Sequence, residues 1–198
     1  MCERRMLPIV GQPQPERADA ARNRQKIIEV AARMIADGSV DQLSLDEVAR
    51  EACVGVGTVY RRFGDRAGLV LALIDDRERR FQAAFLNGPP PVGPGAPPAE
   101  RIRAFLHALV DRVVEQLDLF LLLELGPPAA RLSGPYKVHH THLTALLAQV
   151  RPEGADFLAD ALLAPISAHL LRHQRDERGM SVEEIKAGFD ALTQAIRA

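Results

Sequence analysis

Residues 44–69 read SLDEVAREACVGVGTVYRRFGDRAGL. Ser44 and Glu47 make the capping-box pattern, in which each side chain bonds the other residue's backbone N–H at the start of a helix. Small and apolar residues follow at helical spacing, and Gly55 and Gly57 permit a sharp turn. A second helix follows from about residue 57 to 63, roughly 10 Å long and too short to be stable alone. The stretch predicts two short helices packed across a turn.

The second of these helices has an inward face and an outward face. Val59 and Phe63, four residues apart, are expected to anchor it to the first helix. The residues left to face outward are Thr58, Tyr60, Arg61 and Arg62. Arg and Thr side chains read base edges in the major groove of DNA, and Tyr and Arg bind phosphates. We therefore expect a helix-turn-helix that reads DNA. The alternative is that the two arginines form an ordinary solvated surface.

The neighbouring segments extend this expected DNA-binding surface. Asp65 is a good N-cap for a helix over residues 66–86, whose first turn would hold Arg66 beside the DNA backbone. The residues expected to contact DNA are Ser44, Val56, Gly57, Thr58, Tyr60, Arg61, Arg62 and Arg66. A helix over residues 20–37 precedes them and carries Arg22, Arg24 and Lys26 in its first turns. Whether those three cations reach phosphates is left open.

The segment resembles the DNA-binding domain of the TetR (tetracycline-repressor) family of bacterial transcriptional regulators. The positions that match the family pattern are Ala52, Val54, Gly57, Thr58, Val59, Tyr60, Phe63, Arg66 and Leu69. Cys53 stands where the family usually has glycine, and Arg66 where it usually has lysine. If residue 53 needs a positive φ, a cysteine there costs about 1 kcal/mol. Cys53 is interpreted as a small buried hydrophobic residue, with a redox sensor as the alternative. The resemblance covers residues 20–86.

The whole chain is expected to be all-α. We expect an N-terminal three-helix helix-turn-helix domain, joined by a shared helix to a larger C-terminal helical domain for effector binding and dimerisation. The expected limits are a flexible tail over 1–17, the DNA-binding domain over 18–65 and the C-terminal domain over 66–198. Residues 88–98 are almost entirely Gly and Pro, which indicates a linker or exposed loop. The tail either has no role or forms a basic arm through Arg4, Arg5 and Arg17.

The resemblance implies that the middle helices enclose a small-molecule pocket. Its expected lining is Phe81, Phe105, Leu109, Phe120, Tyr136 and His140. His140 has three interpretations, namely a core histidine with a satisfied hydrogen bond, a pocket residue and a metal ligand. No cofactor and no metal site are expected, because Cys, Asp and Glu ligands are not visibly arrayed nearby. The charged residues 75–80 are expected to be a solvated surface with the i,i+4 pair Asp76–Arg80.

The last two helices have apolar faces that need a cover. In the resembling family, two C-terminal helices of each subunit form a four-helix dimer interface. The residues expected there are Leu162, Ile166, His169, Leu170, Ile185, Phe189, Leu192 and Ile196. The alternative is that these helices pack within one subunit. A dimer would hold two recognition helices about 34 Å apart, one turn of DNA, and would therefore require a palindromic operator.

Charge and composition limit the kind of protein. The formal net charge is −1, so DNA affinity must come from a local basic patch. The two cysteines do not form a disulfide framework, which fits a reduced cytoplasm. The first residues carry no signal-peptide pattern, and the longest apolar runs are too short to span a bilayer. The expected location is the bacterial cytoplasm, in association with the nucleoid and without a membrane partner.

Together these features predict a ligand-responsive transcriptional regulator, most simply a repressor. It is expected to bind double-stranded DNA at a palindromic operator as a homodimer and to be released by a small-molecule effector. The alternatives are an all-helical small-molecule enzyme and a structural DNA binder without an effector. Because nucleophile-elbow, P-loop and zinc-protease motifs are absent from the sequence, no enzymatic activity is expected.

Overall fold

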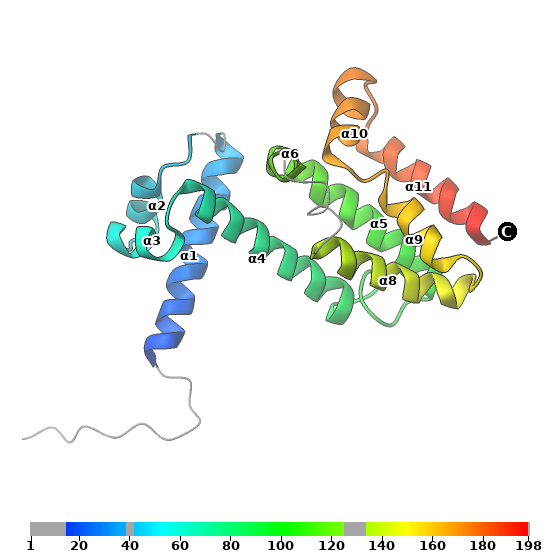
Figure 1. Ribbon diagram of the computed structural model, residues 1–198, viewed down its shortest axis with the longest axis horizontal. Coiled ribbons are helices and arrows are strands. Elements are labelled where there is room, and N and C mark those ends of the chain that lie inside the picture. The colour runs from blue at the N-terminus through cyan, green and yellow to red at the C-terminus, as the bar shows by residue number, and fades with distance from the viewer. Residues whose placement is uncertain (1–14, 39–41, 125–133, 198) are drawn as a thin grey trace, which may run out of the picture. The chain divides into compact units, whose positions relative to one another are not determined.

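A computed structural model describes residues 15–38, 42–124 and 134–197, which form helices joined by turns (Figure 1). The N-terminal helices are α1 (Pro15–Asp37), α2 (Leu45–Glu51), α3 (Val56–Phe63) and α4 (Arg66–Asn87). The later ones are α5 (Pro98–Glu115), α6 (Leu117–Glu124), α8 (Pro135–Val150), α9 (Ala155–Leu163), α10 (Ala168–Arg172), the π-helical turn η2 (His173–Glu177) and α11 (Val182–Arg197). No strand occurs within the described ranges. The predicted all-α fold class is confirmed.

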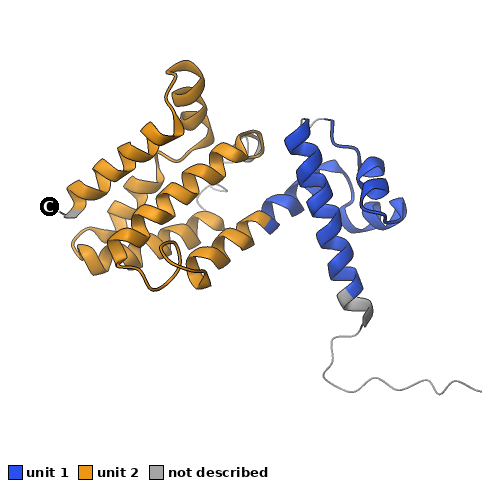
Figure 2. Cartoon of the chain, turned by 180° about the vertical axis from the view of Figure 1, so that it is seen from behind, with its two compact units in different colours: residues 1–76 blue, residues 77–198 orange. Residues whose placement is uncertain are grey.

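The chain forms two compact units, residues 1–76 and 77–198 (Figure 2). Helix α4 begins in the first unit and ends in the second. The sequence prediction placed the boundary at residue 66, where α4 begins. The boundary lies further along because Leu69 and Leu73 of α4 are buried in the first unit.

Unit 1 is built around α1. Its Ile27, Ile28 and Ala31 are fully buried with Val48 of α2 and Val59 of α3. Helix α1 begins at Pro15, so the prediction that residues 15–17 belong to the tail is wrong. Proline is well tolerated at the first helical position because no intrahelical bond uses its missing N–H. The rest of the predicted tail lies outside the described residues.

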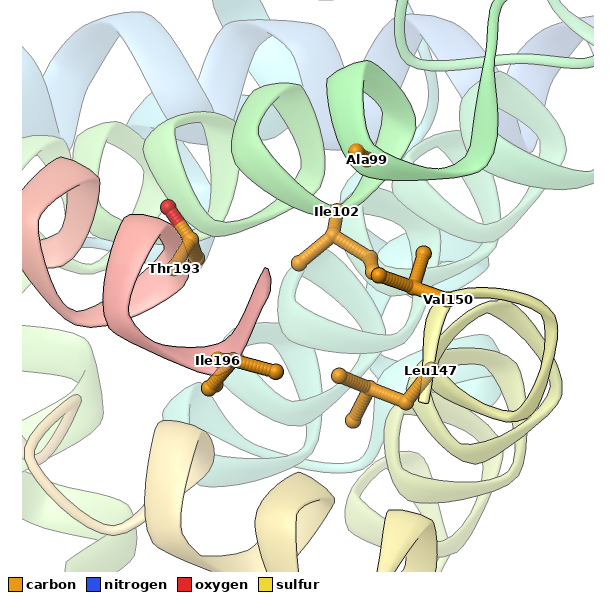
Figure 3. A pocket seen from close by; sticks show the side chains of 6 residues that line it. All are labelled: Ala99, Ile102, Leu147, Val150, Thr193 and Ile196. Carbon is orange, nitrogen blue, oxygen red and sulfur yellow. The ribbon is translucent and has the colours of Figure 1, made fainter. Parts of the chain in front are cut away.

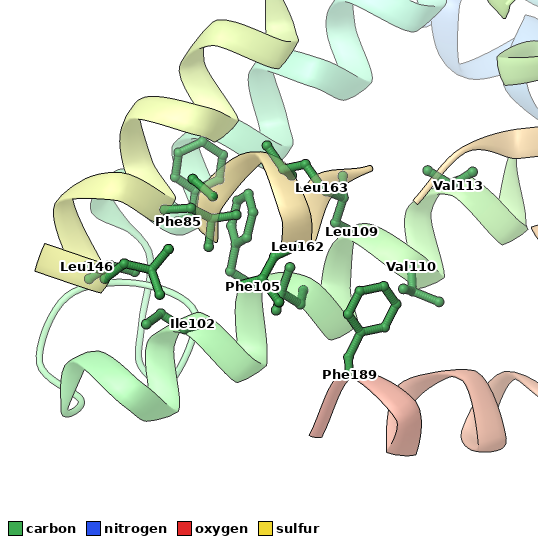
Figure 4. Close-up of a cluster of buried hydrophobic side chains, with 14 of the residues drawn as sticks. Phe85, Ile102, Phe105, Leu109, Val110, Val113, Leu146, Leu162, Leu163 and Phe189 are labelled. Atoms are coloured by element: carbon green, nitrogen blue, oxygen red, sulfur yellow. The ribbon is translucent and has the colours of Figure 1, made fainter. Parts of the chain in front are cut away.

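Unit 2 has α5 at its centre, packed against α8 on one side and α11 on the other. Figure 4 shows the core that these helices share with the end of α4 and with α9. Its labelled residues are Phe85, Ile102, Phe105, Leu109, Val110, Val113, Leu146, Leu162, Leu163 and Phe189. The core therefore joins residues from both ends of this unit's sequence.

The Gly/Pro segment between α4 and α5 is a loop, as predicted, and it is packed. Val92 lies against the core of unit 2, and the N–H of Gly93 donates to the carbonyl oxygen of Pro89 over 3.0 Å. A Cβ atom at Gly93 would lie 1.9 Å from the carbonyl oxygen of Gly88. Only glycine permits this close approach of two backbone segments in the turn. Of the helices described, none is both long and apolar enough to cross a membrane.

Candidate nucleic-acid interface

Helix α3 is held in place by its apolar face. Val59 and Phe63 are buried, as the four-residue spacing predicts, and α3 packs against α2. The facing stripe consists of the small buried residues Val48 and Ala49 of α2 and of Ala52, which directly follows α2, and these allow the two helices to approach closely. A helix of eight residues is thereby fixed in position although it would not be stable alone.

The turn between α2 and α3 contains an unusual backbone conformation. Cys53 has φ 55°, in the left-handed region that favours glycine, which is the residue the resembling family usually has there. The turn is closed by a hydrogen bond from the N–H of Val54 to the carbonyl oxygen of Ala49, 3.0 Å long. The Cys53 side chain is exposed, so its interpretation as a buried hydrophobic residue is wrong. The tight turn directs residue 53 outward, away from the stripe that ends at Ala52.

The outward surface of α3 is accessible. Val56 is 44% exposed and Tyr60 47% exposed, Gly57 and Arg61 are exposed, and Thr58 is half-buried. A Cβ atom added at Gly57 would meet nothing within 4 Å. The backbone at this point of the first turn is therefore open to close approach from outside. Arg61 has no hydrogen-bond or ion-pair partner among the residues that the structure describes.

Arg62 differs from its neighbour. Its guanidinium Nη1 donates a hydrogen bond to the backbone carbonyl oxygen of Ala20 in α1. This contact fixes the end of α3 to α1, so Arg62 has a structural partner that the sequence pattern did not indicate. The two adjacent arginines were expected to act alike because both lie on the outward face, but only the structure places α1 beside one of them.

The caps of α2 and α4 position the edges of this surface. The Ser44 hydroxyl oxygen accepts from the N–H of Glu47 over 3.4 Å, as predicted. The second hydrogen bond of a capping box, from the N–H of Ser44 to the Glu47 carboxylate, does not occur among the described residues. The Glu47 carboxylate lies 3.7 Å from the Arg50 guanidinium. Asp65 caps α4 by accepting from the N–H of Gly68 over 2.8 Å.

Gly68 allows α4 to begin directly after α3. A Cβ atom at this position would lie 1.9 Å from the backbone carbonyl oxygen of Phe63, so no other residue fits. Arg66 is consequently held at the first residue of α4, exposed and close in sequence to α3. On α1, Arg22 pairs with Asp19, and Arg24 lies 3.9 Å from Asp76. Each of these two cations therefore has a carboxylate partner.

The six residues expected to line an effector pocket lie in different surroundings. Phe105 and Leu109 are core residues, and the ring of Phe81 packs 5.4 Å from that of Phe105. The Tyr136 hydroxyl donates to Asp160, and burial followed by this contact raises the pKa of Tyr136 to about 12. His140 Nε2 lies 3.2 Å from the carbonyl oxygen of Asp156, which fits its interpretation as a histidine with a satisfied hydrogen bond.

A buried charged cluster in unit 2 was missed by the sequence reasoning. Glu78 and Arg112 are each 7% exposed, and Glu78 Oε2 lies 2.5 Å from Arg112 Nη1. Glu78 Oε1 lies 3.0 Å from Nε2 of the buried His139 and accepts from Gln82 over 2.7 Å. Burial by itself raises the pKa of Glu78. The His139 hydrogen bond and the charges of His139 and Arg112 together lower this pKa by more, so that it is about 2. The expectation that residues 75–80 are wholly solvated is wrong.

Two of the cavities in the described part of unit 2 are lined by other residues than the six expected ones. The first has a volume of only about 10 Å³ and lies between α5, α8 and α11 (Figure 3). The second has a volume of about 260 Å³ and is lined by Arg77, Arg80, Arg112, Glu115 and Gln116. No group of three or more His, Cys, Asp or Glu in the described part of the chain is placed to hold a metal ion.

The residues expected at a dimer interface divide into three sets. Leu162, Ile185 and Phe189 are buried in the core of their own unit, so a second copy cannot reach them. Ile166 and Ile196 are half-buried against the same core. His169, Leu170 and Leu192 are exposed, and Phe157, which the sequence reasoning left out, is 74% exposed. The apolar stripes indicated burial correctly but did not indicate which surface would cover them.

Unit 1 contains a helix-turn-helix, and the described part of unit 2 is all-helical. The class of protein that this fold defines is therefore a helix-turn-helix protein. Residues 27–73 match the family model described as bacterial regulatory proteins, tetR family. An HTH-type transcriptional regulator from Staphylococcus aureus is 38% identical over 69 residues. By these matches, residues 27–73 of this chain are similar to the bacterial regulatory proteins of the tetR family. The matched segment spans 35% of this chain and 37% of the Staphylococcus protein, so the relationship in sequence lies in one region of each.

Solved structures extend the likeness to the fold of almost the whole chain. A TetR-family transcriptional regulator from Streptomyces coelicolor superposes with a TM-score of 0.65 at 19% identity, covering 90% of this chain and 97% of that one. The regulator FadR from Bacillus subtilis, solved in complex with stearoyl-CoA, gives a TM-score of 0.61 at 14% identity, over 88% and 97% of the two chains. At these identities the likeness establishes a shared fold.

Proposed function

We propose that this protein is a transcriptional regulator that reads operator DNA with α3. The observation that carries the proposal is the outward face of α3, where Gly57, Tyr60 and Arg61 are exposed while Val59 and Phe63 are buried. Arg61 supplies an uncompensated guanidinium of the kind that binds guanine O6 and N7. Phosphate oxygens are contacted by Tyr60, Ser44 and Arg66 in this arrangement, and thymine methyl groups by Val56 and Thr58.

The proposed regulator acts as a homodimer on a palindromic operator. The support is the set of apolar side chains left exposed on the last helices, namely Phe157 of α9, Leu170 of α10 and Leu192 of α11. Covering these residues with the same surface of a second copy removes them from water. A two-fold dimer then presents two copies of α3 to half-sites about one turn of DNA apart.

The proposed regulator is a repressor whose DNA binding is released by a small molecule bound in unit 2. Support comes from the relative of similar fold that holds stearoyl-CoA. Helix α4 is the element through which a ligand would act, because it runs from unit 1 into unit 2. The ligand must bind one state more tightly than the other by about 5.5 kcal/mol to move the population from 1:99 to 99:1.

Selection of bound sequences from a random pool of duplex DNA tests the proposal. The expected result is a two-fold symmetric motif, bound at least about a thousandfold more tightly than random duplex. Titrations of that motif at several salt concentrations then compare the wild type with Arg66→Ala, which should reduce the salt slope by about one unit. Recovery of no enriched motif, with the protein folded, would contradict operator reading.

A further inference from the structure

The part of α4 that belongs to unit 2 is anchored there by two buried residues. Of residues 77–87, Glu78 and Phe85 are buried, and the others are exposed or half-buried. Seven positions separate these two residues, so they lie on the same face of the helix, about two turns or roughly 10 Å apart. One anchor is therefore apolar and the other is charged.

The apolar anchor holds only the last turns of α4. Phe85 lies in the hydrophobic core of unit 2, and its backbone carbonyl oxygen accepts from Arg101 Nη2 over 3.1 Å. Burial of apolar surface is non-directional, because its free energy depends on the area removed from water. A helix anchored at Phe85 alone remains free to tilt or rotate. The setting of α4 in unit 2 therefore depends on the second anchor.

The charged anchor is directional and joins α4 to two other helices. Glu78 Oε2 lies 2.5 Å from Nη1 of Arg112 in α5, and Glu78 Oε1 lies 3.0 Å from Nε2 of His139 in α8. Displacement of α4 by one residue moves the carboxylate by about 1.5 Å along the axis and about 100° around it. Since polar contacts weaken steeply when their geometry is lost, such a displacement removes both contacts together.

The partners of Glu78 are themselves held in place. The guanidinium carbon of Arg112 lies 5.3 Å from the ring centroid of Phe81 and 5.2 Å from that of Phe120. The ring of His139 packs 5.4 Å from that of Phe81. With a pKa of about 2, the Glu78 carboxylate is charged at neutral pH. A buried charge that loses its partners is strongly unfavourable, so these three residues disfavour every other setting of α4.

We propose that the cluster of Glu78, Arg112 and His139 sets the position of α4 in unit 2, and that Glu78 is thereby a positioning residue for operator binding. Helix α4 begins in unit 1, where its Leu69 and Leu73 are buried. A fixed setting of α4 therefore limits the separations that the two copies of α3 adopt in the proposed dimer. This second part rests on the proposed function, whereas the first part concerns unit 2 alone.

Hydrogen–deuterium exchange of the full chain, measured by mass spectrometry, tests the first part. The triple variant Glu78→Met, Arg112→Met and His139→Phe replaces the cluster by apolar side chains. Replacement of a buried ion pair by apolar residues is often neutral or stabilising, so urea should unfold this variant at a concentration no lower than for the wild type. Residues 79–87 should nevertheless exchange roughly tenfold faster, while α11 exchanges as in the wild type.

A cluster that contributes only stability gives a different result. Exchange then follows global stability, and residues 79–87 of the triple variant exchange no faster than in the wild type, which would overturn the inference. Glu78→Gln is the second variant and decides the question if the triple variant does not fold. It keeps the shape of the side chain and removes its charge, so exchange should rise more in residues 79–87 than in α11. An equal rise in both segments would also overturn the inference.

Arg103→Gln is the matched control. It breaks a different ion pair of α5, in which Arg103 Nε lies 2.7 Å from Oδ1 of Asp190 in α11 and no atom of α4 takes part. Exchange in residues 79–87 should stay at the wild-type rate in this variant. Faster exchange there, as large as in Glu78→Gln, would show that loss of any ion pair on α5 loosens α4, which contradicts a specific role of Glu78.

Two duplexes test the second part, the full selected motif and a single half-site. Glu78→Gln should bind the full motif roughly tenfold more weakly, because simultaneous contact by two copies of α3 requires the correct spacing. Its affinity for the half-site, which needs one copy, should equal that of the wild type. Equal losses on both duplexes, or no loss on either, would contradict the positioning role. Recovery of no motif at all would contradict the proposed function, and the exchange measurements would still decide the first part.

Discussion

The guanidinium of Arg62, near the end of α3, donates a hydrogen bond to the backbone carbonyl oxygen of Ala20 in α1. Its neighbour Arg61 has no such partner in the described part of the molecule. Two consecutive arginines on one exposed surface therefore have different roles. Arg62 fixes the short helix to the rest of unit 1, and Arg61 remains available for a ligand of unit 1.

Replacement of Arg62 by alanine is expected to destabilise the protein. Loss of the bond to Ala20 should lower the free energy of unfolding by about 0.5–1.5 kcal/mol. Urea denaturation followed by circular dichroism measures this difference. Arg61→Ala is the matched control and should change the same quantity by less than about 0.5 kcal/mol, as for other surface substitutions. Equal destabilisation by both variants would show that the contact with α1 does not distinguish them.

Replacement of Cys53 by glycine is expected to stabilise the turn between α2 and α3. Cys53 has φ 55°, and glycine adopts this conformation without the clash of a Cβ atom. The free energy of unfolding should rise by about 1 kcal/mol. Cys53→Ala keeps the Cβ atom and should leave stability unchanged, because the thiol is exposed. A gain of the same size in the alanine variant would assign the effect to the thiol.

Gly57→Ala separates folding from DNA binding. A Cβ atom at residue 57 meets nothing within 4 Å in the protein, and alanine stabilises a helix by up to about 1 kcal/mol relative to glycine. The variant should therefore be as stable as the wild type or more so. Its affinity for the selected DNA motif should nevertheless fall roughly tenfold, since the added methyl group separates the backbone from the bases. Fluorescence anisotropy with labelled duplex measures the affinity, and unchanged binding would remove the start of α3 from the interface.

His142 is expected to make stability depend on pH. Burial, followed by the charges of Arg101 and His139, lowers the pKa of His142 from 6.5 to about 4. The unfolded chain therefore binds more protons between pH 6.5 and pH 4, and stability falls as the pH decreases through this window. One proton accounts for at most about 1.4 kcal/mol per pH unit, and this partly exposed ring for less.

The variant His142→Phe tests that origin. The ring of His142 packs 4.5 Å from Phe85 and 5.1 Å from Phe105, so an aromatic replacement keeps these contacts and removes the titrating nitrogen. Urea denaturation at several pH values should show a smaller decrease between pH 6.5 and pH 4 than in the wild type. His173→Gln, at an exposed histidine paired with Glu177, should keep the wild-type decrease. An unaltered pH profile in His142→Phe would show that another group causes the loss of stability between pH 6.5 and pH 4.

The helix-turn-helix was predictable because its signals are local. The caps at Ser44 and Asp65 and the four-residue spacing of Val59 and Phe63 all lie within one short segment. The role of Arg62 was not predictable, because its partner Ala20 is 42 residues away in sequence.

The buried cluster of unit 2 was missed for the same reason. Glu78, Arg112 and His139 come from α4, α5 and α8, and each looks like an ordinary surface charge in its own helix. Likewise, the stripe containing Ile185 and Phe189 predicted a buried helix face correctly, but helical periodicity contains no information about which surface covers it.

The most direct test of DNA reading by α3 compares Arg61→Ala with the wild type on two duplexes, the selected motif and a random sequence of equal length. If Arg61 reads a base, its loss should weaken binding to the motif by about 1–3 kcal/mol and should weaken binding to the random duplex far less. Equal loss on both duplexes, or no loss on either, would contradict the assignment of α3 as the helix that reads the operator.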